Sequence, residues 1–197
     1  MKQALRLFSL AFLLAAFVVE SAAAPFDFRG KVIAIADGDT LRILPSDKRP
    51  RIIRLNGIDA PENGQDFAQV SKRHLSDLVF GKEVTVFGTK LDRYGRYVGT
   101  VPVEGTDANL EQLRAGMAWF CRDYAGDVPA DKRPVYQQAE AEARAAKRGL
   151  WRDSNAIAPW DFRHPRSEAV SSPLSACSCQ TTDRVSMFGW RNSGRES

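Results

Sequence analysis

Arg54-Leu55-Asn56-Gly57-Ile58-Asp59-Ala60-Pro61-Glu62 is the stretch from which this chain is best understood. Arg54 lies in an alternation of apolar and polar residues that is typical of a strand. The alternation ends at Gly57, and Asp59 and Glu62 follow on either side of Pro61. A guanidinium binds phosphate through a planar fork of donors. A carboxylate can hold a hard cation or accept a proton from water. One strand end therefore carries the groups that a metal-dependent phosphodiesterase requires.

The pattern around this stretch predicts an α+β fold. Alternating apolar runs between polar turns predict five strands, at residues 32–36, 41–44, 51–58, 83–87 and 97–103. Helical periodicity predicts three helices, at residues 67–79, 109–115 and 135–148. Five strands with a helix after the third suggest a small Greek-key β-barrel.

Particular residues set the expected helix ends and faces. Gly81, Gly116 and Gly149 are expected to end the three helices, and Thr106 or Asp107 is expected to cap the second. The apolar face expected of the first helix consists of Phe67, Val70, Leu75, Leu78 and Val79.

Two further acidic and basic motifs accompany the first stretch. Asp37-Gly38-Asp39-Thr40 lies at a turn between two expected strands, and Asp92-Arg93-Tyr94-Gly95-Arg96 precedes another. Together with residues 116–119, 149–151 and 158–163, these blocks resemble the staphylococcal nuclease (thermonuclease) family in order and spacing. The resemblance covers roughly residues 28–163. It implies that the barrel is an OB-fold, a five-stranded Greek-key barrel that often binds nucleic acid.

The resemblance also implies roles for particular residues. Asp39, Asp59 and the carbonyl of Ala60 would help to hold one calcium ion, for which oxygen ligands are suited. Arg54 and Arg96 would bind the scissile phosphate and stabilise its developing charge, and Glu62 would act as general base on water. Arg93 and Tyr94 would contact a terminal phosphate, and Tyr124 would lie near the base, where aromatic faces stack without sequence preference.

Each of these residues also has an ordinary structural interpretation. Taken alone, Asp39 is a turn residue that bonds its own backbone, Glu62 an exposed turn carboxylate, and Tyr124 a core aromatic. Asp37 is expected to shape its turn or to support the site. The connection at residues 63–66 is shorter than the flexible loop of the type nuclease, which bears on substrate preference and turnover.

The N-terminus has the layout of a secretory signal. Lys2 and Arg6 precede an apolar run at residues 7–19 and the small residues 21–24, and the run is too short to span a bilayer as a stable helix. We expect a signal peptide at residues 1–23, a nuclease domain at 24–165 and a Ser-rich disordered tail at 166–197. An uncleaved anchor is the alternative. The expected protein is exported, periplasmic or secreted, and monomeric, with no stable membrane insertion after cleavage.

Charge, histidines and cysteines bear on the partner, the kind of catalytic site and the disulfides. Net charge is +4, and loss of Lys2, Arg6 and Glu20 would lower it to +3, so charge alone does not name nucleic acid as the partner. The two histidines, His74 and His164, lack a partner motif, which disfavours histidine-based phosphodiesterases; we expect His74 on a helix surface. The three cysteines, at positions 121, 177 and 179, leave one thiol over or paired between chains. A disulfide between Cys121 and one of the two tail cysteines is an alternative.

Three function classes follow. The favoured one is a calcium-dependent nuclease that hydrolyses DNA and RNA with little sequence preference and, by family analogy, leaves 3′-phosphates. The second is a catalytically silent nucleic-acid-binding module on the same fold, although such modules typically lack the acidic and arginine residues present here. The third is an exported adaptor that engages a partner through Cys177 and Cys179.

Overall fold

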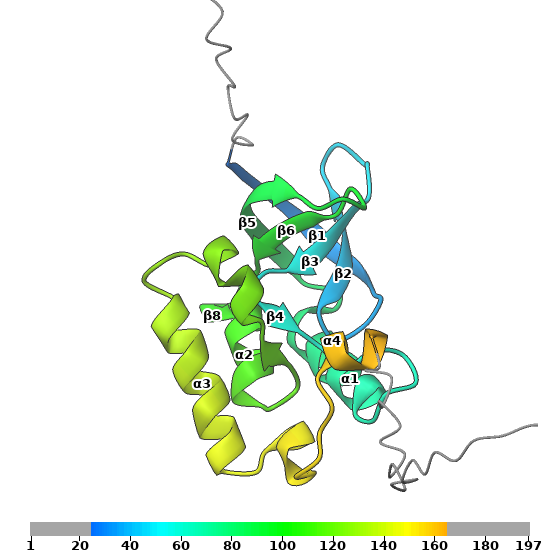
Figure 1. Cartoon of the computed structure of the whole chain (residues 1–197). Helices are drawn as coiled ribbons and strands as arrows, with labels where there is room; N and C mark the ends of the chain where they lie inside the picture. Colours follow the sequence, from blue (N-terminus) through cyan, green and yellow to red (C-terminus); the bar gives the residue numbers. More distant parts are fainter. Residues whose placement is uncertain (1–24, 165–197) are drawn as a thin grey trace, which may run out of the picture. The chain divides into compact units, whose positions relative to one another are not determined.

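The computed structural model describes residues 25–164 and is built on a closed five-stranded barrel (Figure 1). The strands are β1 (Phe26–Ile35), β2 (Thr40–Pro45), β3 (Arg51–Leu55), β5 (Glu83–Leu91) and β6 (Tyr97–Thr100). Their order around the barrel is β1-β2-β3-β6-β5, and β5 closes it by pairing with β1. Only the β3–β6 pair is parallel, and the others in the barrel are antiparallel. The predicted OB-fold α+β class is confirmed.

Alternation along each strand separates the barrel core from its outer surface. On β2 and β3, Leu41, Ile43, Ile53 and Leu55 point inward and are at most 1% exposed. Residues between them point outward, so Arg54 projects from the barrel, with Thr40 opposite it on β2 and Val98 opposite it on β6. The outer face of β3 therefore presents Arg54 to whatever lies beside the barrel.

The three predicted helices are present as α1 (Ala68–Val79), α2 (Ala108–Arg114) and α3 (Arg133–Ala145). Asp107 is the N-cap of α2, since its carboxylate accepts hydrogen bonds from the amides of Asn109 and Leu110. A short helix that the sequence did not predict, α4 (Pro159–Arg163), follows the 3-10 turns η1 (Arg122–Asp127) and η2 (Gly149–Arg152).

Some expected boundaries and one expected helical face are wrong in detail. The expected strand at 51–58 divides at a turn into β3 and β4 (Ile58–Asp59), and the one at 97–103 divides into β6 and β7 (Pro102–Val103). On α1, Val70 is 49% exposed, whereas Ser71 is buried. The Ser71 hydroxyl donates to the carbonyl of Met117, 2.7 Å away, which satisfies a polar group at a core position.

Two small sheets attach the remaining segments to the barrel. β4 pairs with β9 (Trp119–Phe120), and β7 pairs with β8 (Thr106–Asp107). The β4–β9 pairing places Asp59 opposite Trp119, so β9 holds the backbone that carries Asp59.

Several predictions fall outside the described residues. These are the signal peptide at 1–23, the tail at 166–197 and the pairing of Cys177 and Cys179. Within residues 25–164 Cys121 is buried and is not in a disulfide. No helix in this described part of the chain is long and apolar enough to cross a membrane.

Candidate active site

One cleft of about 730 Å³ contains all the residues for which the sequence predicted a function. It lies beside the outer face of β3 and is bounded by the β5–β6 hairpin, η1 and α4. The nine predicted residues that line it are Asp39, Arg54, Asp59, Ala60, Glu62, Arg93, Tyr94, Arg96 and Tyr124. The structure thus brings together residues that are up to 85 positions apart in the sequence.

The turn after β3 sets the position of Asp59 and Glu62. Gly57 has a positive φ of 69°, and a Cβ atom there would lie 2.1 Å from Cγ2 of Val128, so only glycine fits. Asn56 is buried, receives a 2.8 Å hydrogen bond from Nδ2 of Asn109, and donates from its own Nδ2 to the carbonyl of Asp127. These buried amide contacts fix the turn and aim the following residues at the cleft.

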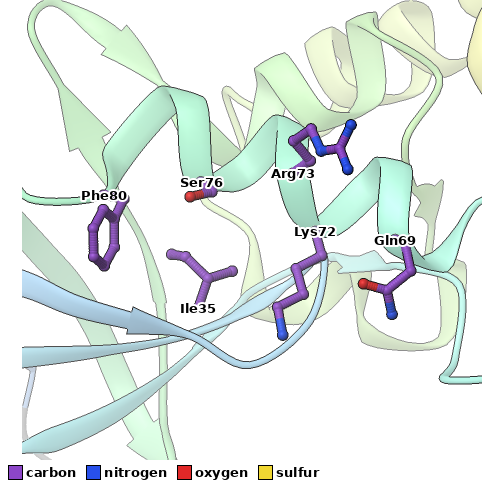
Figure 2. A pocket seen from close by; sticks show the side chains of 6 residues that line it. All are labelled: Ile35, Gln69, Lys72, Arg73, Ser76 and Phe80. Atoms are coloured by element: carbon purple, nitrogen blue, oxygen red, sulfur yellow. The ribbon is translucent and has the colours of Figure 1, made fainter.

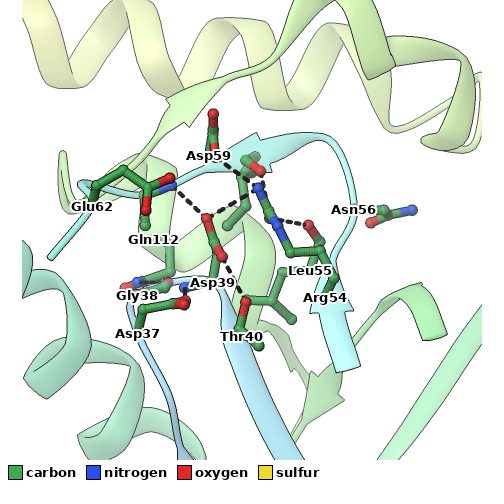
Figure 3. A network of polar contacts seen from close by, with 12 residues as sticks. Asp37, Gly38, Asp39, Thr40, Arg54, Leu55, Asn56, Asp59, Glu62 and Gln112 are labelled. Atoms are coloured by element: carbon green, nitrogen blue, oxygen red, sulfur yellow. Dashed lines mark hydrogen bonds and ion pairs between the residues drawn. The ribbon is translucent and has the colours of Figure 1, made fainter. Parts of the chain in front are cut away.

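Arg54 is the centre of a carboxylate cluster that we define as Asp37, Asp39, Asp59 and Glu62 (Figure 3). Its Nη2 lies 2.8 Å from Oδ1 of Asp59 and 3.2 Å from Oδ2 of Asp39. Its Nη1 donates to the carbonyls of Leu55 and Ile58. Arg54 therefore holds the strand end and two carboxylates together, in addition to the phosphate role predicted for it.

Asp39 is a buried member of the cluster, with 5% of its surface exposed. Its Oδ2 accepts a 2.6 Å hydrogen bond from the amide of Ala60, and its Oδ1 accepts one from the Thr40 hydroxyl. Burial raises the pKa of Asp39 from 3.8 to about 8, although Arg54 acts in the opposite direction. The amide of Asp39 donates to Asp37, so Asp37 shapes the turn as expected. Asp39 is thus more than a turn residue, because its side chain faces the cluster.

A buried glutamine that the sequence analysis missed supports the same turn. Gln112 on α2 is fully buried, and its Nε2 donates to the carbonyl of Gly38 next to Asp39 (Figure 3). His74 shares a hydrogen bond with the Gln112 side-chain oxygen. The expectation of a surface His74 is therefore incomplete: the residue is half-buried and braces Gln112.

The β5–β6 hairpin supplies the other predicted basic and aromatic groups. Nε of Arg96 lies 2.6 Å from Oδ2 of Asp92, whose Oδ1 accepts hydrogen bonds from the amides of Tyr94 and Arg96. Burial opposes ionisation of Asp92, but these bonds hold its pKa below the usual range. The Arg93 guanidinium lies 4.8 Å from the centre of the Tyr94 ring. Asp92 therefore orients the hairpin, a role that the sequence analysis did not assign.

Tyr124 and Glu62 are both accessible. Tyr124 in η1 is 60% exposed, so the core-packing interpretation is wrong. The Glu62 side chain is 38% exposed, and its carboxylate pairs with Arg163 of α4. Trp160 also lines the cleft. The family resemblance at residues 158–163 implied no role for Arg163 or Trp160.

A second pocket beside α1 has a different chemical character (Figure 2). It is lined by Ile35, Gln69, Lys72, Arg73, Ser76 and Phe80. No carboxylate is among these lining residues, so the pocket offers neither an acidic ligand nor a carboxylate base. Hydrolytic chemistry is therefore assigned to the cleft at β3.

The composition of the carboxylate cluster suits a hard divalent cation. Asp39 and Asp59 both reach one guanidinium nitrogen of Arg54, and Ala60 lies between Asp59 and Glu62 in the chain. The four carboxylates of the cluster outnumber the two guanidiniums of Arg54 and Arg163, which pair with three of them, so an excess of two negative charges is left when all are ionised. Within residues 25–164 no group of three or more histidine, cysteine or acidic side chains is gathered as a metal site.

Residues 52–153 match the family described as staphylococcal nuclease homologue. The chain belongs to the staphylococcal nuclease family. It is 42% identical to an uncharacterized endonuclease of Escherichia coli O157:H7 over 70% of this chain and 86% of that protein. It is 39% identical to the micrococcal nuclease of Shigella flexneri over 80% and 92% of the two chains, and 40% identical to an uncharacterized endonuclease of Haemophilus influenzae over 81% and 85%. As a member of this nuclease family, the protein is a phosphodiesterase that acts on nucleic acid, and the family uses a metal ion.

Proposed function

We propose that this nuclease is calcium-dependent, hydrolyses both DNA and RNA with little sequence preference, and leaves 3′-phosphates. The observation that carries the proposal is the gathering of Asp39, Arg54, Asp59, Glu62 and Arg96 on one cleft. All the candidate ligands are oxygen atoms, and calcium accepts such ligands in flexible geometry. The cleft lining includes four arginines and one lysine, which can meet phosphates, and three aromatic side chains, which can meet base faces; this supports recognition without sequence readout.

The residues divide the hydrolysis between them. Asp39, Asp59 and the Ala60 carbonyl would hold the calcium ion, which would supply positive charge beside the phosphoryl oxygens. Glu62, accessible on its loop, would orient the attacking water and take its proton. Arg96, aligned by Asp92, would stabilise the negative charge that grows on the phosphoryl oxygens.

The remaining predicted groups would hold the nucleotide. Arg93 and Tyr94 would contact a terminal phosphate, and exposed Tyr124 would offer a ring face to a base. Attack on phosphorus with departure of the 5′ oxygen of the next nucleotide leaves the phosphate on the 3′ side. We further propose that the enzyme acts as a monomer. The signal-like sequence at residues 1–23 supports the proposal that it acts outside the cytoplasm, in the periplasm or the medium.

The test is digestion of supercoiled plasmid and of single-stranded RNA by the purified protein, with calcium, with magnesium or with excess chelator. We expect nicking and degradation of both substrates in calcium only. DNA products should resist extension by a polymerase until a phosphatase removes their 3′-phosphates. Glu62→Gln is the matched inactive control and should lower kcat on the order of 10²-fold.

Two outcomes would contradict the proposal. Full activity in chelator would exclude the single-calcium mechanism. Binding of DNA without cleavage by the wild-type protein would favour the silent binding module instead.

A further inference from the structure

The end of the described chain lies against the loop that carries Glu62. Two hydrogen bonds connect them through Gln65: its side-chain oxygen accepts from the amide of Glu62 at 2.9 Å, and its side-chain nitrogen donates to the carbonyl of Ile157. Ile157 lies two residues before the start of α4, next to its N-cap residue Ala158. The short helix and the loop are therefore held in a fixed relation by backbone and side-chain contacts.

Arg163, in α4, forms a bridge between two carboxylates of the cluster. Its Nη2 lies 2.7 Å from Oδ2 of Asp59, and its Nη1 lies 3.4 Å from Oδ1 of Asp59 and also contacts Oε1 of Glu62. The three residues come from the strand end, the loop after it and a helix about 100 positions away. A forked guanidinium can engage two carboxylates at fixed angles, which an ammonium cannot.

The two carboxylates differ in how firmly they are held. The Asp59 side chain is 5% exposed, and its Oδ1 is also bound by Arg54. The Glu62 side chain is 38% exposed, and its ion-pair partner within residues 25–164 is Arg163. Arg163 thus connects a fixed carboxylate to one that would otherwise sample several rotamers.

We propose that Arg163 is a positioning residue that holds the Glu62 carboxylate beside Asp59, ready to act on the attacking water. The proposal rests on the function proposed above for Glu62. A base that is misplaced by about 1 Å can lose on the order of 10²-fold in rate, so a bridge that fixes Glu62 contributes mainly to kcat. Arg163 contacts Oε1 of Glu62, and the proposal assigns the attacking water to Oε2.

Two other roles of Arg163 make different predictions. A direct phosphate ligand would affect substrate binding, and its loss would raise KM. An exposed surface ion pair is worth little, because solvent screens it, and its loss would change neither constant.

The experiment compares Arg163→Ala, Arg163→Gln and Arg163→Lys with Arg152→Ala as the matched control. Arg152 lies in η2 and is exposed, and it does not line the cleft. We expect Arg163→Ala to lower kcat on a single-stranded oligonucleotide on the order of 10- to 100-fold, with KM changed by less than about twofold. Arg163→Lys should recover part of the loss, and Arg152→Ala should behave as wild type.

Two further measurements separate positioning from damage to the site. Calcium affinity, measured by calorimetry without substrate, should be unchanged or tighter in Arg163→Ala, because a positive charge has left the cluster; a damaged site would bind calcium more weakly. In a Glu62→Gln background, adding Arg163→Ala should cause no further loss of kcat, since Arg163 acts through Glu62.

The proposal is overturned by an unchanged kcat in Arg163→Ala, by a rise in KM alone, or by an equal loss in the Glu62→Gln background. If Arg163→Ala lacks a cooperative thermal transition, the same comparison is made with Arg163→Gln and Arg163→Lys. Failure of the general proposal looks different, because the wild-type enzyme itself would then be inactive with calcium or active in chelator.

Discussion

At the scale of single residues, the two central arginines have different surroundings and should respond differently to substitution. Arg54 holds buried Asp39 and Asp59, whereas Arg96 contacts the half-buried Asp92 at the edge of the cleft. Arg54→Ala removes the ion-pair partner of buried Asp39 and one of the two partners of buried Asp59, so it should destabilise the fold by about 3–5 kcal/mol. Arg96→Ala should leave stability nearly unchanged and lower kcat on the order of 10²–10³-fold. Urea unfolding and steady-state kinetics on both variants check this, and equal stability losses would contradict it.

The pKa of Asp39 predicts how stability depends on pH when the metal is removed. The native pKa of about 8 lies above the ordinary value of 3.8, so between these values the folded protein keeps a proton that the unfolded chain has lost. Stability in chelator should therefore fall as pH rises from about 4 to 8 and change little from this source above 8. Asp39→Asn cannot lose a proton and should show a flatter profile. Thermal unfolding of both proteins at several pH values is the measurement, and parallel profiles would contradict the prediction.

At the scale of the elements, the turn between β3 and β4 is the part most sensitive to a small change. Gly57→Ala places a Cβ against Val128 and forces a left-handed backbone on alanine. We expect a loss of roughly 2–4 kcal/mol in the free energy of unfolding, together with lower activity, because Asp59 and Glu62 follow the turn. Gly81→Ala is the control, since Gly81 also has a positive φ of 76° but has open space where a Cβ would lie. It should show the smaller cost of backbone strain alone; similar losses in the two variants would show that contact with Val128 does not matter.

Local pattern explains which elements could be predicted from the sequence. The barrel strands were found because buried residues alternate along them, and the break at Gly57 was found because glycine commonly marks such turns. The roles of the nine site residues followed from the family resemblance; eight of them lie in short local motifs, and Tyr124 was assigned by its place relative to those motifs. Ser71 was missed at a core position of α1 because its burial depends on a hydrogen bond to Met117, 46 positions away.

Arg163 shows why the rest of the site could not be predicted in the same way. α4 has five residues, too few for helical periodicity to be detected. The contact of Arg163 with Asp59 joins positions 104 residues apart. Nothing local to either residue specifies that pairing, and the same holds for Gln112 and the carbonyl of Gly38. Such contacts are set by how the elements pack, and the structure was needed to find them.

At the scale of the whole molecule, the excess negative charge of the cluster predicts that calcium stabilises the fold. A ligand that binds only the native state adds about 2.7 kcal/mol at a concentration 100 times its Kd, which corresponds to a rise in Tm of roughly 10 °C for a domain of this size. Magnesium, which favours rigid octahedral sites and keeps its water, should add less.

The calcium effect should also grow with pH, which connects it to the buried carboxyl of Asp39. Below about pH 8 the native protein must release the Asp39 proton before that carboxylate can hold a cation, so binding is weaker there. We therefore expect the calcium-induced rise in Tm to be larger at pH 9 than at pH 6, and to be much smaller at both values in Asp39→Asn. Calorimetric scans with saturating calcium and with chelator measure both differences. A calcium shift that is equal at the two pH values, or that persists undiminished in Asp39→Asn, would mean that the cation binds elsewhere on the molecule.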